Sequence, residues 1–265
     1  MKTKNFLLVG IITLAGLFSI TSCNNDDDPV AEEAISEEEV VEILSTSLAS
    51  GTDGVTADIE TAAGLSRQSV DDSNSIKSAN IGKTLSCGES SDTTFTIQRG
   101  SSLITFESSK TYNYMLECDE SENPLLLDIN LMYEGNLDAP RVASQHSGSA
   151  DFTVASIEHT SDMYLINGTW KRSGSFESKI RNQGTRQASL RFELIDVAVE
   201  KEPKEIDNGT IIFSIEGESA SGSSSADYKY EGTITYNGNG EAIIEISGSS
   251  SSYITNLETG EVEEL

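Results

Sequence analysis

Residues 228–246, YKYEGTITYNGNGEAIIEI, decide the fold class of this chain. Apolar and polar side chains alternate on both sides of the Asn-Gly-Asn-Gly segment at 237–240, and a period of two is typical of half-buried antiparallel strands. An Asn-Gly dipeptide between two such runs favours a tight hairpin. The stretch therefore predicts two neighbouring antiparallel strands joined by a short loop.

The same alternation recurs in segments that precede this hairpin. The apolar residues that share a face are Tyr112, Tyr114, Leu116 and Cys118; Leu125, Leu127, Ile129, Leu131 and Tyr133; Tyr164, Ile166 and Trp170; and Ile211, Phe213 and Ile215. Between residues 188 and 200 the apolar positions change from even to odd numbers, which predicts a β-bulge near Leu194–Ile195. Each segment is therefore predicted to be a strand with one buried face.

The number and spacing of these segments predict a mainly β protein. We expect about ten to twelve strands between residues 83 and 257, with no long helix among them. Parallel strands need crossover connections, which are usually helices, so the sheet is expected to be antiparallel. Residues 81–265 are therefore predicted to form one antiparallel β domain, either a sandwich or a curved meander of the half-barrel type.

The segment before the β domain carries helical signals. Ser36 and Glu39 have the spacing of a capping box, and apolar residues follow at helical intervals. This pattern predicts one helix over about 37–49 and a second over about 55–65. A mostly disordered acidic spacer is the alternative. The resulting division is a short acidic helical hairpin at 37–65, packed on the β domain, and a linker at 66–80.

The composition limits the classes of partner. The chain has 265 residues and a formal net charge of −27, from 44 acidic and 17 basic side chains, and residues 24–60 contain twelve acids and no Lys or Arg. Contacts with nucleic-acid phosphates need clustered Lys and Arg, so we expect no nucleic-acid partner. Only residues 6–20 form a long apolar segment, which excludes a polytopic membrane protein.

The first residues have the order of a secretory signal. Lys2 and Lys4 precede an apolar stretch of 15 residues, the length of a signal-peptide core. The tetrapeptide Ile20-Thr21-Ser22-Cys23 follows, and it resembles a bacterial lipobox, in which small residues precede a Cys that takes a thioether-linked lipid. The resemblance implies that residues 1–22 are removed and that Cys23 anchors the protein in a membrane. An ordinary secretory peptide with a chance Cys is the alternative.

An acidic run follows the lipobox at Asp26, Asp27 and Asp28. In this place it resembles the export signal of Gram-negative surface-exposed lipoproteins. The resemblance implies an outer-membrane protein on the cell surface, with residues 23–36 as an acidic tether. A solvated tether without a sorting role is the alternative.

Two cysteines remain once Cys23 is set aside. Cys87 and Cys118 both precede acidic, turn-like sequence. In an oxidising envelope two such cysteines are expected to form a disulfide between strand ends. Two free thiols in the core are the alternative.

The sequence contains no strong catalytic motif. His146 and His159 are thirteen residues apart, whereas a zinc site needs more His or Cys at tight spacing. Residues 217–221 begin like a nucleophile elbow but lack its final Gly. We therefore expect no metal ligand, no cofactor and no enzymatic activity.

Two groups of side chains are candidates for binding. A local excess of positive charge could meet the acidic N-terminal helices, lipid phosphates or an anionic glycan, and it consists of Lys171, Arg172, Lys179, Arg181, Arg186 and Arg191. Two tyrosine pairs, each on one strand face, are candidates for stacking on sugar rings, and they are Tyr112, Tyr114, Tyr228 and Tyr230. A solvated strand face is the alternative for the first group, and core packing for the second.

These features predict a lipid-anchored envelope protein whose β domain has a non-enzymatic binding or structural role toward a glycan or another envelope component. Three rival hypotheses stay open, and one of them is a hydrolase, which would need convergent polar residues in a pocket. An accessory glycan- or nutrient-binding lipoprotein of an uptake system would need a row of exposed aromatic side chains. A lipid-handling half-barrel would need an apolar concave face large enough for an acyl chain.

Overall fold

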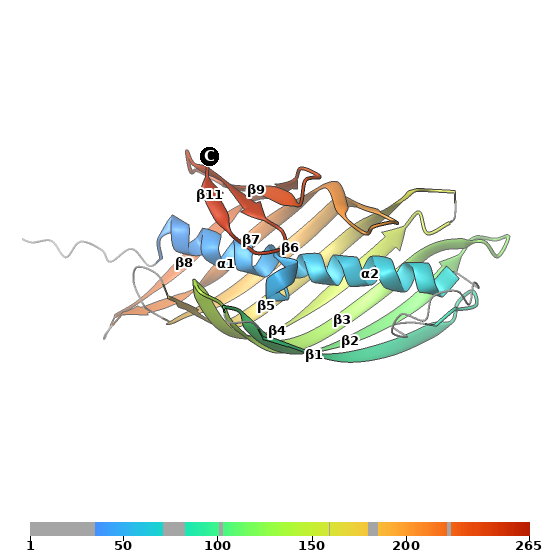
Figure 1. Ribbon diagram of the computed structural model, residues 1–265, viewed down its shortest axis with the longest axis horizontal. Helices are drawn as coiled ribbons and strands as arrows, with labels where there is room; N and C mark the ends of the chain where they lie inside the picture. Colours follow the sequence, from blue (N-terminus) through green and yellow to red (C-terminus); the bar gives the residue numbers. More distant parts are fainter. Residues whose placement is uncertain (1–34, 71–82, 101–102, 159, 180–184, 222–223) are drawn as a thin grey trace, which may run out of the picture. The chain divides into compact units, whose positions relative to one another are not determined.

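The computed structural model describes residues 35–70, 83–100, 103–158, 160–179, 185–221 and 224–265, which lie within one unit of the chain, residues 33–265. Two helices and a 3-10 turn precede eleven strands (Figure 1). The elements are α1 (Glu37–Leu48), η1 (Ser50–Thr52), α2 (Val55–Val70), β1 (Ser90–Gly100), β2 (Thr105–Cys118), β3 (Pro124–Asp138), β4 (Val142–Ala155), β5 (Met163–Ser178), β6 (Thr185–Glu200), β7 (Ile206–Ser221), β8 (Ser224–Tyr236), β9 (Glu241–Ile246), β10 (Ser252–Asn256) and β11 (Val262–Glu264).

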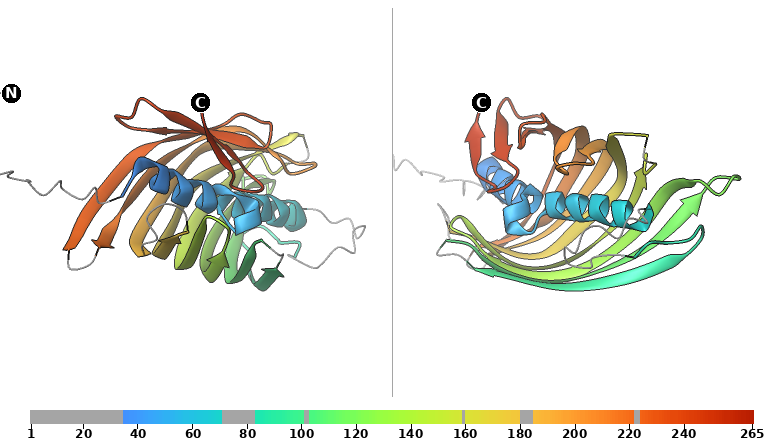
Figure 2. Two further views of the ribbon diagram at one scale, coloured as in Figure 1. Left: turned by 60° about the vertical axis from the view of Figure 1, so that its left-hand side comes forward. Right: turned by 45° about the vertical axis from the view of Figure 1, so that its right-hand side comes forward.

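The strands form one antiparallel sheet in which each strand pairs with the next along the chain. Among the described strands, β1 and β11 are the two edges, and the sheet is not closed. The predicted antiparallel domain is confirmed, and eleven strands lie within the predicted range. The curved meander is the alternative that the structure adopts, because the described strands belong to a single sheet and not to two packed ones (Figures 1 and 2).

Glycines on the inner face of the sheet lie beneath aromatic rings of the neighbouring strand. Gly148 pairs with Tyr133, and Gly217 pairs with Tyr228. A Cβ atom at Gly148 would lie 2.4 Å from the Tyr133 hydroxyl oxygen, and one at Gly217 would lie 2.6 Å from the Tyr228 hydroxyl oxygen. The ring and a carbonyl oxygen of the strand on the other side therefore fill the space that a side chain would need.

Two bulges face each other across β5 and β6. The register shifts between Ile166 and Gly168 on β5, and between Ile195 and Ala198 on β6. The Asn167 side chain donates to the Asp196 carboxylate at 3.2 Å, and the Asp196 amide donates to the Asn167 side-chain oxygen at 2.8 Å. The bulge predicted near Leu194–Ile195 is confirmed at the next residues, and the Asn167 side chain satisfies the Asp196 amide that the bulge frees.

The two predicted helices are confirmed, including the capping box between Ser36 and Glu39 at the start of α1. The expected linker from residue 66 is wrong for its first five residues, because α2 continues to Val70. The hydroxyls of Ser66 and Ser69 donate to carbonyl oxygens four residues back along the helix. These bonds satisfy the two hydroxyls, so both side chains can be buried and a polar sequence can continue as a packed helix. Residues 71–80 of the expected linker lie outside the described residues.

The helices lie end to end on the concave face of the sheet, and they do not fold back side by side as a hairpin (Figures 1 and 2). The turn between them has Asp53 in the left-handed region, with φ of 60°. The Ser50 amide donates to the Leu257 carbonyl at 2.7 Å, and the Gly51 amide donates to the Glu258 carbonyl at 2.8 Å. The turn is thereby joined to the loop after β10, so the C-terminal strands hold the middle of the helical segment.

A disulfide joins Cys87, which precedes β1, to Cys118 at the end of β2. The Cα atoms are 5.6 Å apart, within the usual range for a disulfide. The predicted pairing is confirmed. Within the described residues, no helix is long and apolar enough to cross a membrane.

Removing this disulfide should destabilise the edge of the sheet. The bridge closes a loop with a sequence separation of 31 residues, and a loop of that size is worth about 3–4 kcal/mol in the chain-entropy model. Urea unfolding of the double variant Cys87→Ala, Cys118→Ala should show this loss. A reductant should lower the stability of the unmodified protein to the same level and leave the variant unchanged. Equal stability of the two proteins without reductant would contradict the prediction.

Candidate functional site

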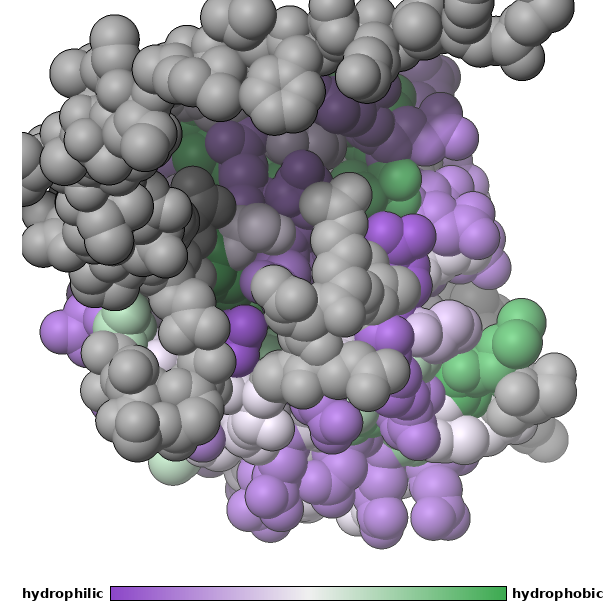
Figure 3. Space-filling view, turned by 90° about the vertical axis from the view of Figure 1, so that its left-hand side faces the viewer, coloured by the Kyte–Doolittle hydropathy of each residue, from purple (hydrophilic) through white to green (hydrophobic). Residues whose placement is uncertain are grey.

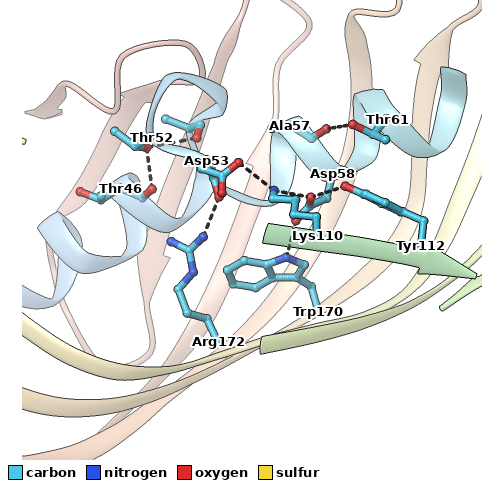
Figure 4. Close-up of polar contacts among 11 residues, drawn as sticks. Thr46, Thr52, Asp53, Ala57, Asp58, Thr61, Lys110, Tyr112, Trp170 and Arg172 are labelled. Atoms are coloured by element: carbon cyan, nitrogen blue, oxygen red, sulfur yellow. Dashed lines mark hydrogen bonds and ion pairs between the residues drawn. The ribbon is translucent and has the colours of Figure 1, made fainter. Parts of the chain in front are cut away.

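The most densely connected polar cluster lies between α2 and the inner face of the sheet, and its centre is Asp58 (Figure 4). The Asp58 carboxylate accepts hydrogen bonds from the Lys110 ammonium at 2.6 Å, the Tyr112 hydroxyl at 2.7 Å and the Trp170 indole nitrogen at 2.9 Å. Asp58 and Trp170 are fully buried, and Tyr112 is 1 % exposed. Three donors compensate the desolvation of one buried carboxylate.

Lys110 is the buried cation of this cluster. Its ammonium lies 2.6 Å from Asp58 and 2.8 Å from Asp53. Burial disfavours the charged form, but the two carboxylates outweigh it and hold the pKa of Lys110 above its usual value. Burial, followed by the Asp58 charge, raises the pKa of Tyr112 well above its usual value, so this hydroxyl stays a donor.

Arg172 extends the cluster toward the turn between the helices. One of its terminal nitrogens donates to the Asp53 carbonyl at 2.6 Å, and its guanidinium lies 4.8 Å from the centroid of the Trp170 ring. Trp170 in turn stacks between Tyr133 and Phe192, at 5.6 and 5.2 Å between ring centroids. The guanidinium also lies 5.7 Å from the centroid of the Tyr133 ring, so one carbonyl and two aromatic faces hold it.

His146 lies beside this cluster as a neutral, buried imidazole. It is 5 % exposed, and its Nδ1 lies 2.9 Å from the Ser144 hydroxyl. Burial, followed by the positive charges of Arg172 and Lys110, lowers the pKa of His146 to about 2. Its Nε2 has no hydrogen-bond partner among the described residues.

The acids of α1 also face the sheet. Glu39 lies 3.8 Å from the Arg186 guanidinium, and Glu42 forms an ion pair with Arg141. Glu37 accepts hydrogen bonds from Ser249 at 2.6 Å and from Tyr253 at 3.0 Å. An acidic helix is thus docked by basic and hydroxyl groups of the sheet and of the C-terminal segment.

This arrangement binds the chain's own helices. Its central members are all under 10 % exposed, and they come from the helical segment, β2 and β5. No group of three or more potential metal ligands occurs among the described residues. The cluster therefore fixes the helical segment in the concavity.

The sheet separates the basic residues that the sequence places together. Lys171 and Arg191 are exposed and directly opposite each other on β5 and β6. Arg172 and Arg186 have the opposite parity and lie buried under the helices, while Lys179 pairs with Asp138. A single anion-binding patch is therefore wrong, since alternate strand residues face opposite sides. Arg172 and Arg186 instead contact the acidic helical segment. Arg181 lies outside the described residues.

The tyrosine pairs belong to the inner face. Tyr112, Tyr114 and Tyr228 are buried, and Tyr230 is half-buried with its hydroxyl donating to the Ile35 carbonyl at 2.9 Å. Stacking on sugar rings is therefore wrong for the three buried rings, because the helices and neighbouring strands cover their faces. Cys23, Asp26, Asp27 and Asp28 lie outside the described residues.

The outer face is hollowed by a polar trough that crosses the strands. Two open depressions of about 860 and 570 Å³ meet at Ser147, Ser173 and Gly174. Carboxylates and amides form much of their walls, including Glu134, Gln145, Gln187, Glu216, Glu218 and Asp227. The side of the molecule in Figure 3 is likewise mainly hydrophilic, with hydrophobic residues in separate patches. The trough offers hydrogen-bonding groups to a polar partner.

The buried cluster is not among the predicted sites, although the sequence contains one signal for it. Lys110 has the same strand parity as Tyr112, Tyr114 and Leu116, so it is a charge on an apolar face. A buried charge needs a partner of opposite sign, and the acidic helical segment was the available source. The spacing does not identify Asp58 among the twelve acids there.

Comparisons of the chain with protein-family models, with curated proteins and with solved structures return no match.

Replacing Asp58 by Asn should be strongly destabilising. The variant keeps the side-chain volume but leaves Lys110 with only Asp53, and breaking a buried ion pair costs about 3–5 kcal/mol. Chemical unfolding followed by circular dichroism measures the loss. The matched control is Asp151→Asn on the outer face, where the exposed carboxylate accepts one bond from Asn130, and it should change stability by under about 0.5 kcal/mol. Equal losses in the two variants would contradict the role of the cluster.

The buried imidazole should make the protein less stable in mild acid. Because the pKa of His146 is lowered from 6.5 to about 2 in the folded state, its contribution is complete above pH 6.5 and is lost progressively as the pH falls toward 2. Between pH 7.5 and 5.0 the unmodified protein should lose about 2 kcal/mol more than His146→Gln, which cannot titrate. Urea unfolding at both pH values measures the difference. Parallel pH profiles would contradict the prediction.

Proposed function

We propose that this protein is a lipid-anchored envelope protein, displayed at the cell surface, with a non-enzymatic binding or structural role. The lipobox-like Ile20-Thr21-Ser22-Cys23 and the acidic run after it support the anchor and the location. Cys23 would supply the link to the outer membrane, because several acyl chains on one residue hold a protein firmly. A glycan or another envelope component would be the partner.

One observation carries the binding or structural role: the concave face of the sheet is committed to the chain's own helices. Curved sheets commonly hold small ligands in their concavity. Here α1 and α2 lie in it (Figure 2), and the buried Asp58–Lys110 pair fixes α2 against β2. The surface left for a partner is the outer face and the edges of the sheet.

Two of the rival hypotheses gain less from the structure. A lipid-handling half-barrel would present an apolar concavity, but this one contains Lys110, Arg172 and His146 and is occupied by helices. Glycan binding through stacked aromatic rings would need exposed Tyr or Trp, but Trp170 is fully buried.

A glycan-binding accessory role is the second candidate, and the outer trough favours it. Hydroxyl, amide and carboxylate groups line this trough, which is about 860 Å³ in its larger part. Such groups hydrogen-bond sugar hydroxyls without stacking. This candidate would place the ligand at Ser173 and Ser189, on the face away from the helices.

Protease treatment of intact cells tests the proposed location. The unmodified protein should be cleaved by a protease that cannot cross the outer membrane. Replacing Asp26, Asp27 and Asp28 with Ala should protect it while the lipid stays attached, and Cys23→Ala should release it from the membrane fraction. Permeabilised cells should show equal cleavage of both membrane-bound proteins, and a periplasmic marker should stay intact in whole cells. Protection of the unmodified, lipidated protein would overturn surface display.

A further inference from the structure

The two edges of the open sheet differ in length and charge. At one edge β11 has three residues, Val262–Glu264, and two of them are glutamates. At the other edge β1 has eleven residues, Ser90–Gly100, and pairs with β2 over its whole length without a register shift. Short, charged edges resist pairing with another strand, whereas long regular ones are templates for it. β1 therefore has the properties of an assembly edge, and β11 does not.

The sequence of β1 has few of the features that usually block an exposed edge. It reads SSDTTFTIQRG, with no Pro, no Lys and no bulge. Its single acid, Asp92, and its single base, Arg99, cancel within a chain of net charge −27. Thr, Phe and Ile favour strands. This edge is therefore nearly neutral, and a second copy can approach it without the repulsion that the rest of the surface produces.

The hydrogen-bond alternation along β1 shows which residues face the open edge. The Leu116 amide on β2 donates to the Glu89 carbonyl at 3.1 Å. Because backbone groups alternate along an antiparallel strand, those of the odd-numbered residues of β1 point toward β2. The backbone groups of Asp92, Thr94, Thr96 and Gln98 then point away from β2. Among the described strands, none pairs with that side of β1.

We propose that two copies of this protein associate through their β1 strands, antiparallel about a two-fold axis at Phe95. This register overlaps all eleven residues and places Thr94 opposite Thr96 of the second copy. It sets Asp92 opposite Gln98 and Ser91 opposite Arg99, so no like charges face each other. It also covers Phe95 and Ile97, which are only half-buried and pack against the core.

The proposed contact produces a dimer and not a longer assembly. An isologous contact uses the same strand of both partners, so β1 is consumed. The remaining edges are the short acidic β11 strands, which do not propagate the sheet. About ten backbone hydrogen bonds across eleven residue pairs are comparable to a typical protein interface. The inference is independent of the proposed membrane anchor.

Cysteine cross-linking tests this pairing in the full chain. The double variant Thr94→Cys, Thr96→Cys should give a covalent dimer on oxidation, in cells and after purification, because each new thiol faces the other position of the second copy. The matched control is Gln187→Cys, Ser189→Cys, which has the same spacing on exposed positions of β6 and should stay monomeric. Co-expressed tagged and untagged copies should appear together in the cross-linked band.

A second variant separates assembly from folding. The double variant Thr94→Glu, Thr96→Glu places carboxylates of the two copies opposite each other. Their repulsion should raise the dimer dissociation constant at least tenfold in sedimentation experiments. Gln187→Glu, Ser189→Glu has a similar excess of acid on β6 and should leave the constant within about twofold. A band that contains a different protein, equal cross-linking of the control, or a monomer at all concentrations of the unmodified chain would each overturn the proposal.

Discussion

The rest of the structure depends on the buried carboxylate of Asp58. Its donors are Lys110 and Tyr112 on β2 and Trp170 on β5, so one side chain of α2 joins two strands that are separated by two others. An isolated buried carboxylate is very unfavourable, and only simultaneous contact with these donors compensates it. The helix position and the local curvature of the sheet are therefore specified together: a flatter sheet would separate β2 from β5, and a shifted helix would leave a charge unpaired.

This constraint gives the inner and outer faces of the sheet different chemistry. The inner face supplies the partners for the helices, and its polar groups are used for that purpose. The outer face carries a trough whose carboxylates and amides are accessible. The edges differ again, since β1 offers regular backbone groups and β11 offers three residues. The outer face and the β1 edge are therefore the surfaces that the helices leave uncovered.

Local sequence patterns predicted the parts of the fold that depend on neighbouring residues. The period of two identified the strands, the Asn-Gly-Asn-Gly segment identified the β8–β9 hairpin, and Ser36 with Glu39 identified the start of α1. The end of α2 was missed, because Ser66 and Ser69 read as linker residues until burial and back-bonding to the helix are known. The choice between sandwich and curved meander depends on long-range contacts, which no single strand pattern contains.

The basic residues around β5 and β6 show why a local charge excess is ambiguous in sequence. Parity sends Arg172 and Arg186 inward, where they meet Asp53 and Glu39, and sends Lys171 and Arg191 outward. In a chain with 44 acids, the carboxylates of a packed acidic helix need positive charge or hydrogen-bond donors on the surface that they face. The inward-facing members of this basic group, Arg172 and Arg186, thus supply the positive charge that faces the N-terminal helices. The outward-facing members include Lys171 and Arg191, which lie opposite each other on β5 and β6.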